Sequence, residues 1–131
     1  MLTPHTPAAL RPPFANYAHA MEVSAGTRLL FISGQLGIHP DESVPEGAEE
    51  QADLIFANIA VILAEAGMTP ADIVRINAFV SGREHLQPYM RARDRFVAGA
   101  GPASTLMIVT GFAREIFKVE IEVVAAAAPR P

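Results

Sequence analysis

The sequence predicts an α+β fold in which two helices cover one face of a β-sheet. Apolar residues recur at three- and four-residue spacing in two segments, 52–66 and 86–97, as they do in helices that face a core. Five other segments alternate between apolar and polar residues or are rich in β-branched residues, which is typical of strands. Their order is β-β-α-β-α-β-β, and two helices packed on such a sheet form an α+β sandwich.

One domain accounts for the whole chain, residues 1–131. A length of 131 residues with 50% hydrophobic and 18% charged residues is typical of a single packed core. Residues 1–13 are rich in proline, which fixes φ and removes a donor, so we expect an extended lead-in there. The end of the chain, 126–131, has no pattern for packing and is expected to fray.

The first two strands are expected to form a hairpin. Residues 17–23 alternate along a strand, and residues 29–32 are apolar on both faces, as in a buried strand. The intervening Ser24-Ala25-Gly26 has the composition of a turn. We therefore expect 17–23 to pair with 29–32.

The middle of the chain predicts a helix, a strand and a second helix. Gly67 follows the helical segment 52–66 and is suited to cap it. Residues 73–80 are β-branched and alternating, which indicates a strand. Because proline is tolerated in the first turn of a helix, Pro88 places the start of the second helix near His85.

The last two strands are predicted over 104–110 and 117–123, the latter with the cleanest alternation in the chain. Residues 29–32 and 104–109 carry apolar side chains for both faces of a sheet, whereas the two helices cover one face only. An uncovered apolar face predicts that the protein forms oligomers.

Composition excludes several classes of function. A net charge of −4 and a pI near 5.5 argue against a nucleic-acid partner, since that binding needs clustered Lys and Arg. No apolar run is long enough for a membrane span and no secretory signal opens the chain, so we expect a cytoplasmic protein. The chain lacks cysteine, and no metal site is expected because the histidines show no ligand spacing; these are His5, His19, His39 and His85.

Several polar positions have both a structural and a functional interpretation. Ser33 follows a strand, where turn serines are common. Arg91, Arg93 and Arg95 form a basic cluster, of which Arg91 and Arg95 share one helix face, and the cluster is either solvated or a contact for a ligand or partner. Glu120 and Glu122 share one face of the last strand, which is usually the solvent face. If another subunit covers that face, a carboxylate there is partly desolvated and can act as a general acid or base on water.

Several short motifs, taken in order and spacing, resemble the YjgF/RidA family of imine deaminases, also called the endoribonuclease L-PSP family. The resemblance covers residues 7–125. The motifs are Pro-Phe-Ala-Asn-Tyr-Ala-His-Ala at 13–20, Phe31-Ile32-Ser33-Gly34-Gln35, Glu50-Gln51, Asp72-Ile73-Val74, Gly101-Pro102-Ala103 and Val119-Glu120-Ile121-Glu122.

The resemblance implies a chorismate-mutase-like fold and a homotrimer whose sheets pack inward, with ligand clefts between adjacent subunits. It implies hydrolysis of an imine or enamine of a short 2-keto acid to the keto acid and ammonia, without a metal or organic cofactor. By the same resemblance, Glu120 is the carboxylate that positions or activates water. The implied binding residues are Tyr17, Ser33, Gly34 and Thr105.

One position departs from the family pattern. Ser104 stands where the resemblance implies an arginine that grips the substrate carboxylate. A guanidinium makes two charge-assisted bonds to a carboxylate, so its loss would weaken binding by about 2–4 kcal/mol, or about 30- to 1000-fold. Arg11, Arg28 and Arg114 are candidate replacements.

Two functions are therefore open at this point. The first is a cofactor-free imine or enamine deaminase whose substrate preference is altered by Ser104. The second is a non-catalytic trimer that binds a small metabolite or a protein partner. Ribonuclease activity is disfavoured by the acidic pI and by the lack of a basic face.

Overall fold

The computed structural model describes residues 2–97, 99 and 101–130 and confirms the α+β class with two helices. It has one more strand than the sequence pattern indicates, because a short strand opens the chain. Short 3₁₀ helices cover Pro70–Asp72 and Arg83–His85. The main elements are β1 (Leu2–His5), β2 (Ala20–Val23), β3 (Arg28–Leu36), α1 (Ala48–Glu65), β4 (Ile73–Val80), α2 (Leu86–Phe96), β5 (Ala103–Ile108) and β6 (Val119–Ala127).

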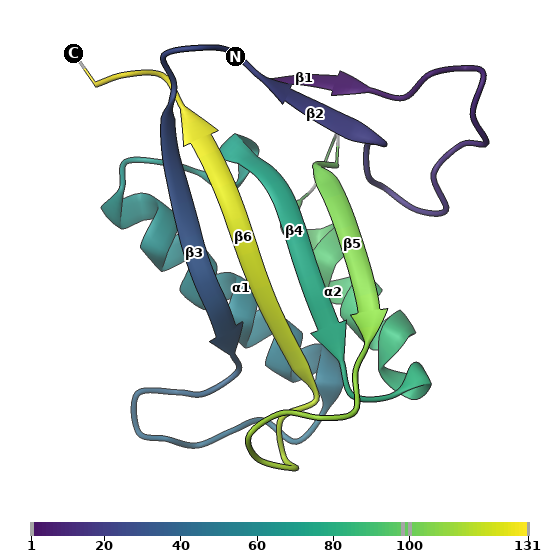
Figure 1. Ribbon diagram of the computed structural model, residues 1–131. Coiled ribbons are helices and arrows are strands. Elements are labelled where there is room, and N and C mark those ends of the chain that lie inside the picture. Colours follow the sequence, from purple (N-terminus) through teal and green to yellow (C-terminus); the bar gives the residue numbers. More distant parts are fainter. Residues whose placement is uncertain (1, 98, 100, 131) are drawn as a thin grey trace.

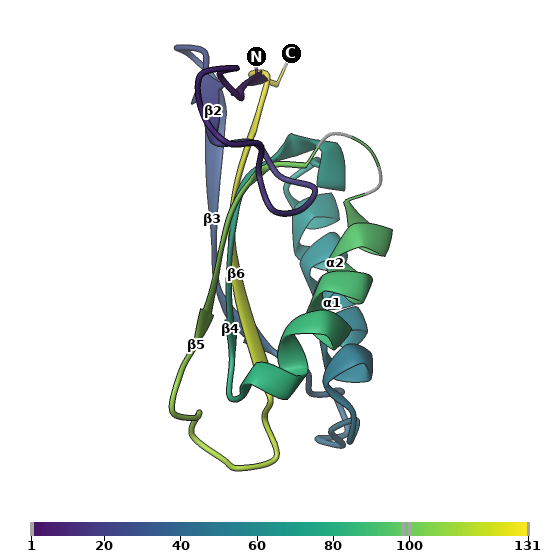
Figure 2. The same ribbon diagram turned by 90° about the vertical axis from the view of Figure 1, so that its right-hand side faces the viewer.

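A four-stranded sheet in the order β3-β6-β4-β5 forms one layer (Figure 1). The neighbours of β6 are antiparallel to it, whereas β4 and β5 are parallel and are joined by the crossover through α2. Both helices lie on the same face of this sheet (Figure 2). The core lies between the two layers, where Ile59 of α1, Ile76 of β4 and Ile121 of β6 are fully buried.

The predicted hairpin between 17–23 and 29–32 is wrong. β2 pairs antiparallel with β1 in a separate two-stranded sheet, and β3 pairs with β6 instead. Alternation identifies a strand but carries no information on its partner. The lead-in expected over 1–13 accordingly contains β1, and Tyr17 lies in the segment that precedes β2.

The prediction that the chain frays from residue 126 onwards is also wrong for its first two residues. β6 continues through Ala127, with Ala125 opposite Leu30 and Ala127 opposite Arg28 on the long strand β3. These alanines are buried because their small side chains fit closely against the neighbouring layer. The strand predicted over 73–80 is confirmed at both ends.

The uncovered apolar face predicted from the sequence is present on the side of the sheet opposite the helices. Phe31 is 72% exposed there, and Leu29 and Met107 are exposed as well. No helix in the described ranges of the chain combines the length and apolarity that crossing a membrane requires.

Candidate functional site

A cavity of about 210 Å³ lies at the β5 edge of the sheet, on the same side as the helices; we call it the edge cavity. Three parts of the chain build its wall: the segment before β2, the helix α2 and the strand β5. The cavity therefore joins residues far apart in the sequence. Its lining residues are Phe14, Ala15, Tyr17, Met90, Arg93, Ser104 and Leu106.

Tyr17 is held in this cavity by contacts between its segment and the start of β5. The Ala18 N–H donates to the Pro102 carbonyl at 3.1 Å, and the Asn16 side-chain amide donates to the Gly99 carbonyl at 2.9 Å. A Cβ at residue 101 would lie 2.0 Å from the Asn16 carbonyl oxygen, so glycine is required at Gly101. The sequence thus brings Tyr17 beside Ser104.

Ser104 and Thr105 point to opposite faces of the sheet, because successive residues of a strand alternate. Ser104 lines the edge cavity on the helix side. The Thr105 hydroxyl oxygen instead accepts a hydrogen bond from Arg75 Nη2 at 2.8 Å. Of the predicted binding residues, Tyr17 and Ser104 meet in one cavity and Thr105 does not line it.

Arg93 is a cavity residue that the sequence interpretation missed. Its side chain is 3% exposed, and its Nε and Nη2 atoms donate to Asp94 Oδ1 at 3.2 and 3.0 Å. A signal was present in the sequence, since Arg93 lies four residues after Tyr89 and three before Phe96, on the apolar stripe of α2. Its neighbours Arg91 and Arg95 belong to the exposed face.

Glu120 lies close to Gly34 across the β3–β6 pair. A Cβ at residue 34 would lie 2.7 Å from Glu120 Oε1, so the glycine leaves room for the carboxylate. The register of this pair shifts between Ile32 and Gln35, which marks an irregularity around Ser33 and Gly34. The structure therefore brings Gly34 and Glu120 together.

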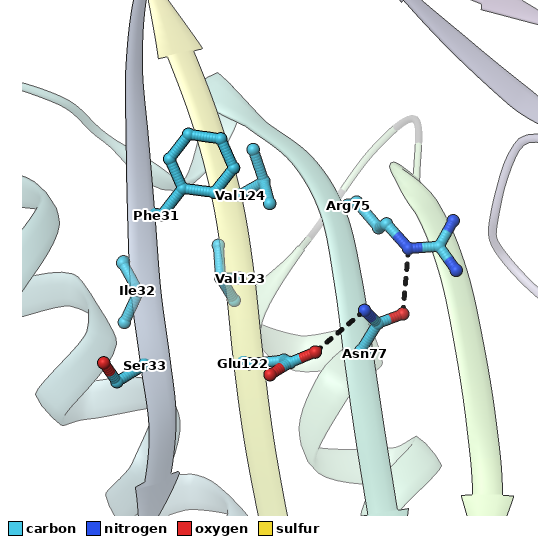
Figure 3. A pocket seen from close by; sticks show the side chains of 8 residues that line it. All are labelled: Phe31, Ile32, Ser33, Arg75, Asn77, Glu122, Val123 and Val124. Carbon is cyan, nitrogen blue, oxygen red and sulfur yellow. Dashed lines mark hydrogen bonds between the residues drawn. The ribbon is translucent and has the colours of Figure 1, made fainter.

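Ser33 belongs to a second hollow, of about 260 Å³, on the open face of the sheet (Figure 3). A chain of polar side chains crosses it: Arg75 Nε donates to Asn77 Oδ1 at 2.9 Å, and Asn77 Nδ2 donates to Glu122 Oε1 at 3.0 Å. Phe31 and Val124 form its apolar border. The hollow thus places a bonded row of polar groups on an otherwise apolar surface.

The predicted site residues therefore fall into two groups within one chain. Tyr17 and Ser104 line the edge cavity, whereas Ser33 and Glu120 belong to β3 and β6, with β4 between β6 and β5. The chain alone does not bring the predicted catalytic carboxylate to the edge cavity.

The three arginines considered as replacements at position 104 do not line the edge cavity. Arg11 lies nearest, with its guanidinium carbon 4.0 Å from the ring centroid of Phe14. Arg28 donates to the Ala66 and Ala128 carbonyls, and Arg114 lies 4.7 Å from the ring centroid of Phe117. Within residues 2–97, 99 and 101–130, no three His, Cys, Asp or Glu side chains gather where they could hold a metal ion.

The chain is similar to a known protein family and to several known sequences. Residues 8–127 match the family model described as endoribonuclease L-PSP. The RutC family protein YjgH of Escherichia coli is 31% identical over 121 residues, covering 91% of this chain and 90% of that protein. A RutC family protein of Aquifex aeolicus is 39% identical over 80 residues, which is 60% of this chain and 58% of that protein.

Solved structures share the whole fold. The Rid-family protein YyfB of Yersinia pestis, described as a protein of unknown function, has a TM-score of 0.84 and 28% identity, covering 96% of this chain and 98% of that one. RidA of Psychrobacter sp. PAMC 21119 has a TM-score of 0.72 and 26% identity, covering 93% and 94% of the two chains.

Proposed function

The chain belongs to the YjgF/RidA family, also named endoribonuclease L-PSP, and from this premise we propose that it is a cofactor-free hydrolase of small imine or enamine metabolites. The observation that carries the proposal is the edge cavity, in which Tyr17 and Ser104 meet. These are two of the positions that the family resemblance assigns to the substrate cleft.

The reaction needs only water and a positioned carboxylate. Water adds to the C=N carbon of the imine, the nitrogen is protonated, and the C–N bond then breaks to give the keto compound and ammonia. Glu120 is the proposed general base: it passes one proton from the attacking water to the imine nitrogen, and then the proton of the new hydroxyl group to the leaving nitrogen, so that ammonia departs. A small cavity of about 210 Å³ suits a substrate of a few carbon atoms.

The proposed assembly is a homotrimer in which Glu120 of a neighbouring subunit completes each edge cavity. Two features support it: the separation of Glu120 from the cavity within one chain, and the exposed Phe31 and Leu29 on the open face of the sheet. Large exposed apolar side chains on one surface mark a site of association.

Ammonia release from freshly generated 2-iminobutanoate and 2-iminopropanoate tests the proposal. We expect turnover by the wild type and a loss of about 100- to 10,000-fold in Glu120→Gln, the usual effect of removing a general base. The control is Glu65→Gln, an exposed carboxylate at the end of α1. Equal rates in wild type and Glu120→Gln would contradict the proposed chemistry.

A second candidate function is a trimer that binds a small metabolite without converting it. Ser104 favours it, because a neutral hydroxyl replaces the charged group that the family resemblance implies at this position. Thermal stabilisation by small keto acids in the absence of any ammonia release would identify this function, since a ligand of the native state raises the melting temperature.

A further inference from the structure

We propose that Arg93 is the residue that binds the substrate carboxylate, so that α2 supplies the cation that β5 lacks at Ser104. The inference rests on the proposed function, because it assigns a substrate class, small carboxylates, to the edge cavity. It names a residue that none of the sequence motifs pointed to.

The position of Arg93 is the first support. Arg93 lines the edge cavity, together with the hydroxyl-bearing residues Tyr17 and Ser104. Gln51 and Arg93 are the buried polar or charged side chains among the described residues, and Arg93 is the one that lines this cavity. Arg11, the nearest of the other candidates, is exposed and lies outside the lining.

The charge balance of Arg93 is the second support. A buried cation is costly unless it is paired, and both bonds from Arg93 to Asp94 end on a single oxygen, Oδ1. Asp94 is itself 53% exposed, so solvent weakens this pair. A guanidinium has five N–H donors in a planar fork, which leaves Arg93 the capacity to bind a second carboxylate.

The composition of the cavity is the third support. Phe14, Met90 and Leu106 give it apolar walls, which accommodate a short carbon chain. A second guanidinium at position 104 would share about 210 Å³ with that of Arg93, and two like charges at this range repel. Arg93 thus gives a physical reason for the serine at residue 104.

Equilibrium binding of 2-oxobutanoate, measured by titration calorimetry, tests the proposal without any catalytic readout. Arg93→Gln should weaken binding by about 10- to 100-fold, the effect of losing hydrogen bonds to a charged group. Asp94→Asn should tighten binding, because it removes the carboxylate that competes for Arg93; a merely structural role of Arg93 predicts no such gain. The methyl ester of 2-oxobutanoate should bind equally to wild type and Arg93→Gln.

Two matched variants separate Arg93 from the other cations. Arg11→Gln at the rim and Arg114→Gln beside Phe117 should bind 2-oxobutanoate as the wild type does. Because Arg93→Gln removes a buried charge, its melting curve must show a folded protein, and Ser104→Arg placed in the Arg93→Gln background should restore binding. That rescue is not expected if the loss comes from misfolding.

Three results would overturn the assignment: wild-type affinity in folded Arg93→Gln, a loss confined to Arg11→Gln or Arg114→Gln, or no binding of 2-oxobutanoate by the wild type at millimolar concentration. None of these decides the chemistry of Glu120, which the ammonia assay reports separately. Conversely, 2-oxobutanoate binding that depends on Arg93 in a protein without turnover would support this assignment and the non-catalytic function together.

Discussion

The two faces of the four-stranded sheet differ in how completely one chain covers them. On the helix face, Ile76 and Ile121 are fully buried against α1 and α2. On the open face, Phe31 is 72% exposed beside the polar chain of Arg75, Asn77 and Glu122. The helix face therefore determines the stability of a single chain, whereas the open face is expected to determine how the chains assemble and how the site is completed.

The largest expected effect is on the helix face. Ile121→Ala should lower the free energy of unfolding by about 2–5 kcal/mol, because it removes buried methyl groups and leaves a cavity between β6 and the helices. Chemical denaturation measures this change. Val124→Ala, on the partly covered open face of the same strand, is the control and should cost less in a monomeric sample. Equal losses of unfolding free energy in both variants would contradict the difference between the two faces.

On the open face, a change should affect assembly rather than the fold of the chain. Phe31→Ser is expected to dissociate the proposed trimer, since it removes a large apolar contact that solvent covers in the single chain. Light scattering should then report one chain of 14.0 kDa instead of three. Val61→Ser, an equally exposed apolar residue on α1, should leave the mass unchanged; the same mass in both variants would argue against association through the sheet.

A smaller effect is expected at Tyr89, the polar exception within the covered layer. Its hydroxyl is buried without a hydrogen-bond partner in the described part of the chain, and burial raises the pKa of the phenol so that it stays neutral. Tyr89→Phe should therefore raise the free energy of unfolding by about 1 kcal/mol, because it removes an unsatisfied polar group. Thermal denaturation measures this gain. A loss of stability would mean that the hydroxyl is bonded.

The smallest effect is expected on the outer surface of the helices, where the charges are already paired. Arg91 and Arg95 donate to Glu49 at 2.9 and 2.8 Å, and Arg95 also pairs with Asp53, which supports the solvated-surface interpretation of these arginines. The bonds from Arg91, and then from Arg95, hold the pKa of Glu49 below its usual 4.5. Solvent weakens such exposed pairs, so their contribution to stability is slight.

This contribution has a defined direction with pH. Because the folded pKa of Glu49 is lowered, the stabilisation is present above pH 4.5 and is lost as the pH falls through the folded pKa. Glu49→Gln should thus lower the melting temperature slightly at neutral pH and match the wild type in strong acid. A difference that grows on acidification would contradict this assignment.

The sequence predicted those parts of the fold that local pattern determines. The β-branched run Ile73–Val80 was identified at both ends, because alternation and β-propensity agree there. The pairing of β2 with β1 could not be predicted, because the alternating residues that end at Val23 could pair equally well with β1 or with β3. The alanines at the end of β6 show no alternation that would predict a strand. The structure shows that they pair with β3, which begins at Arg28 and is long enough to reach them.

The candidate site was predictable in part. Tyr17 and Ser104 were identified through motifs and meet in the edge cavity, although they lie 87 positions apart in the sequence. Arg93 was hidden among Arg91 and Arg95, because a cluster of charges on a helix is usually read as a solvated face. Helical spacing from Tyr89 was the signal that distinguished it.

The hydrogen bond from Asn16 to the Gly99 carbonyl closes a loop of 83 residues, and it has a consequence for the order of folding. Contacts between such distant segments form slowly, since a longer loop costs more chain entropy to close. The pairing of β3 with β6 joins residues that are just as distant, Arg28 with Ala127 among them, so both the sheet and the docking of the N-terminal segment are expected to form late in folding. A chain cut just before β2 would keep the central layer and lose one wall of the edge cavity.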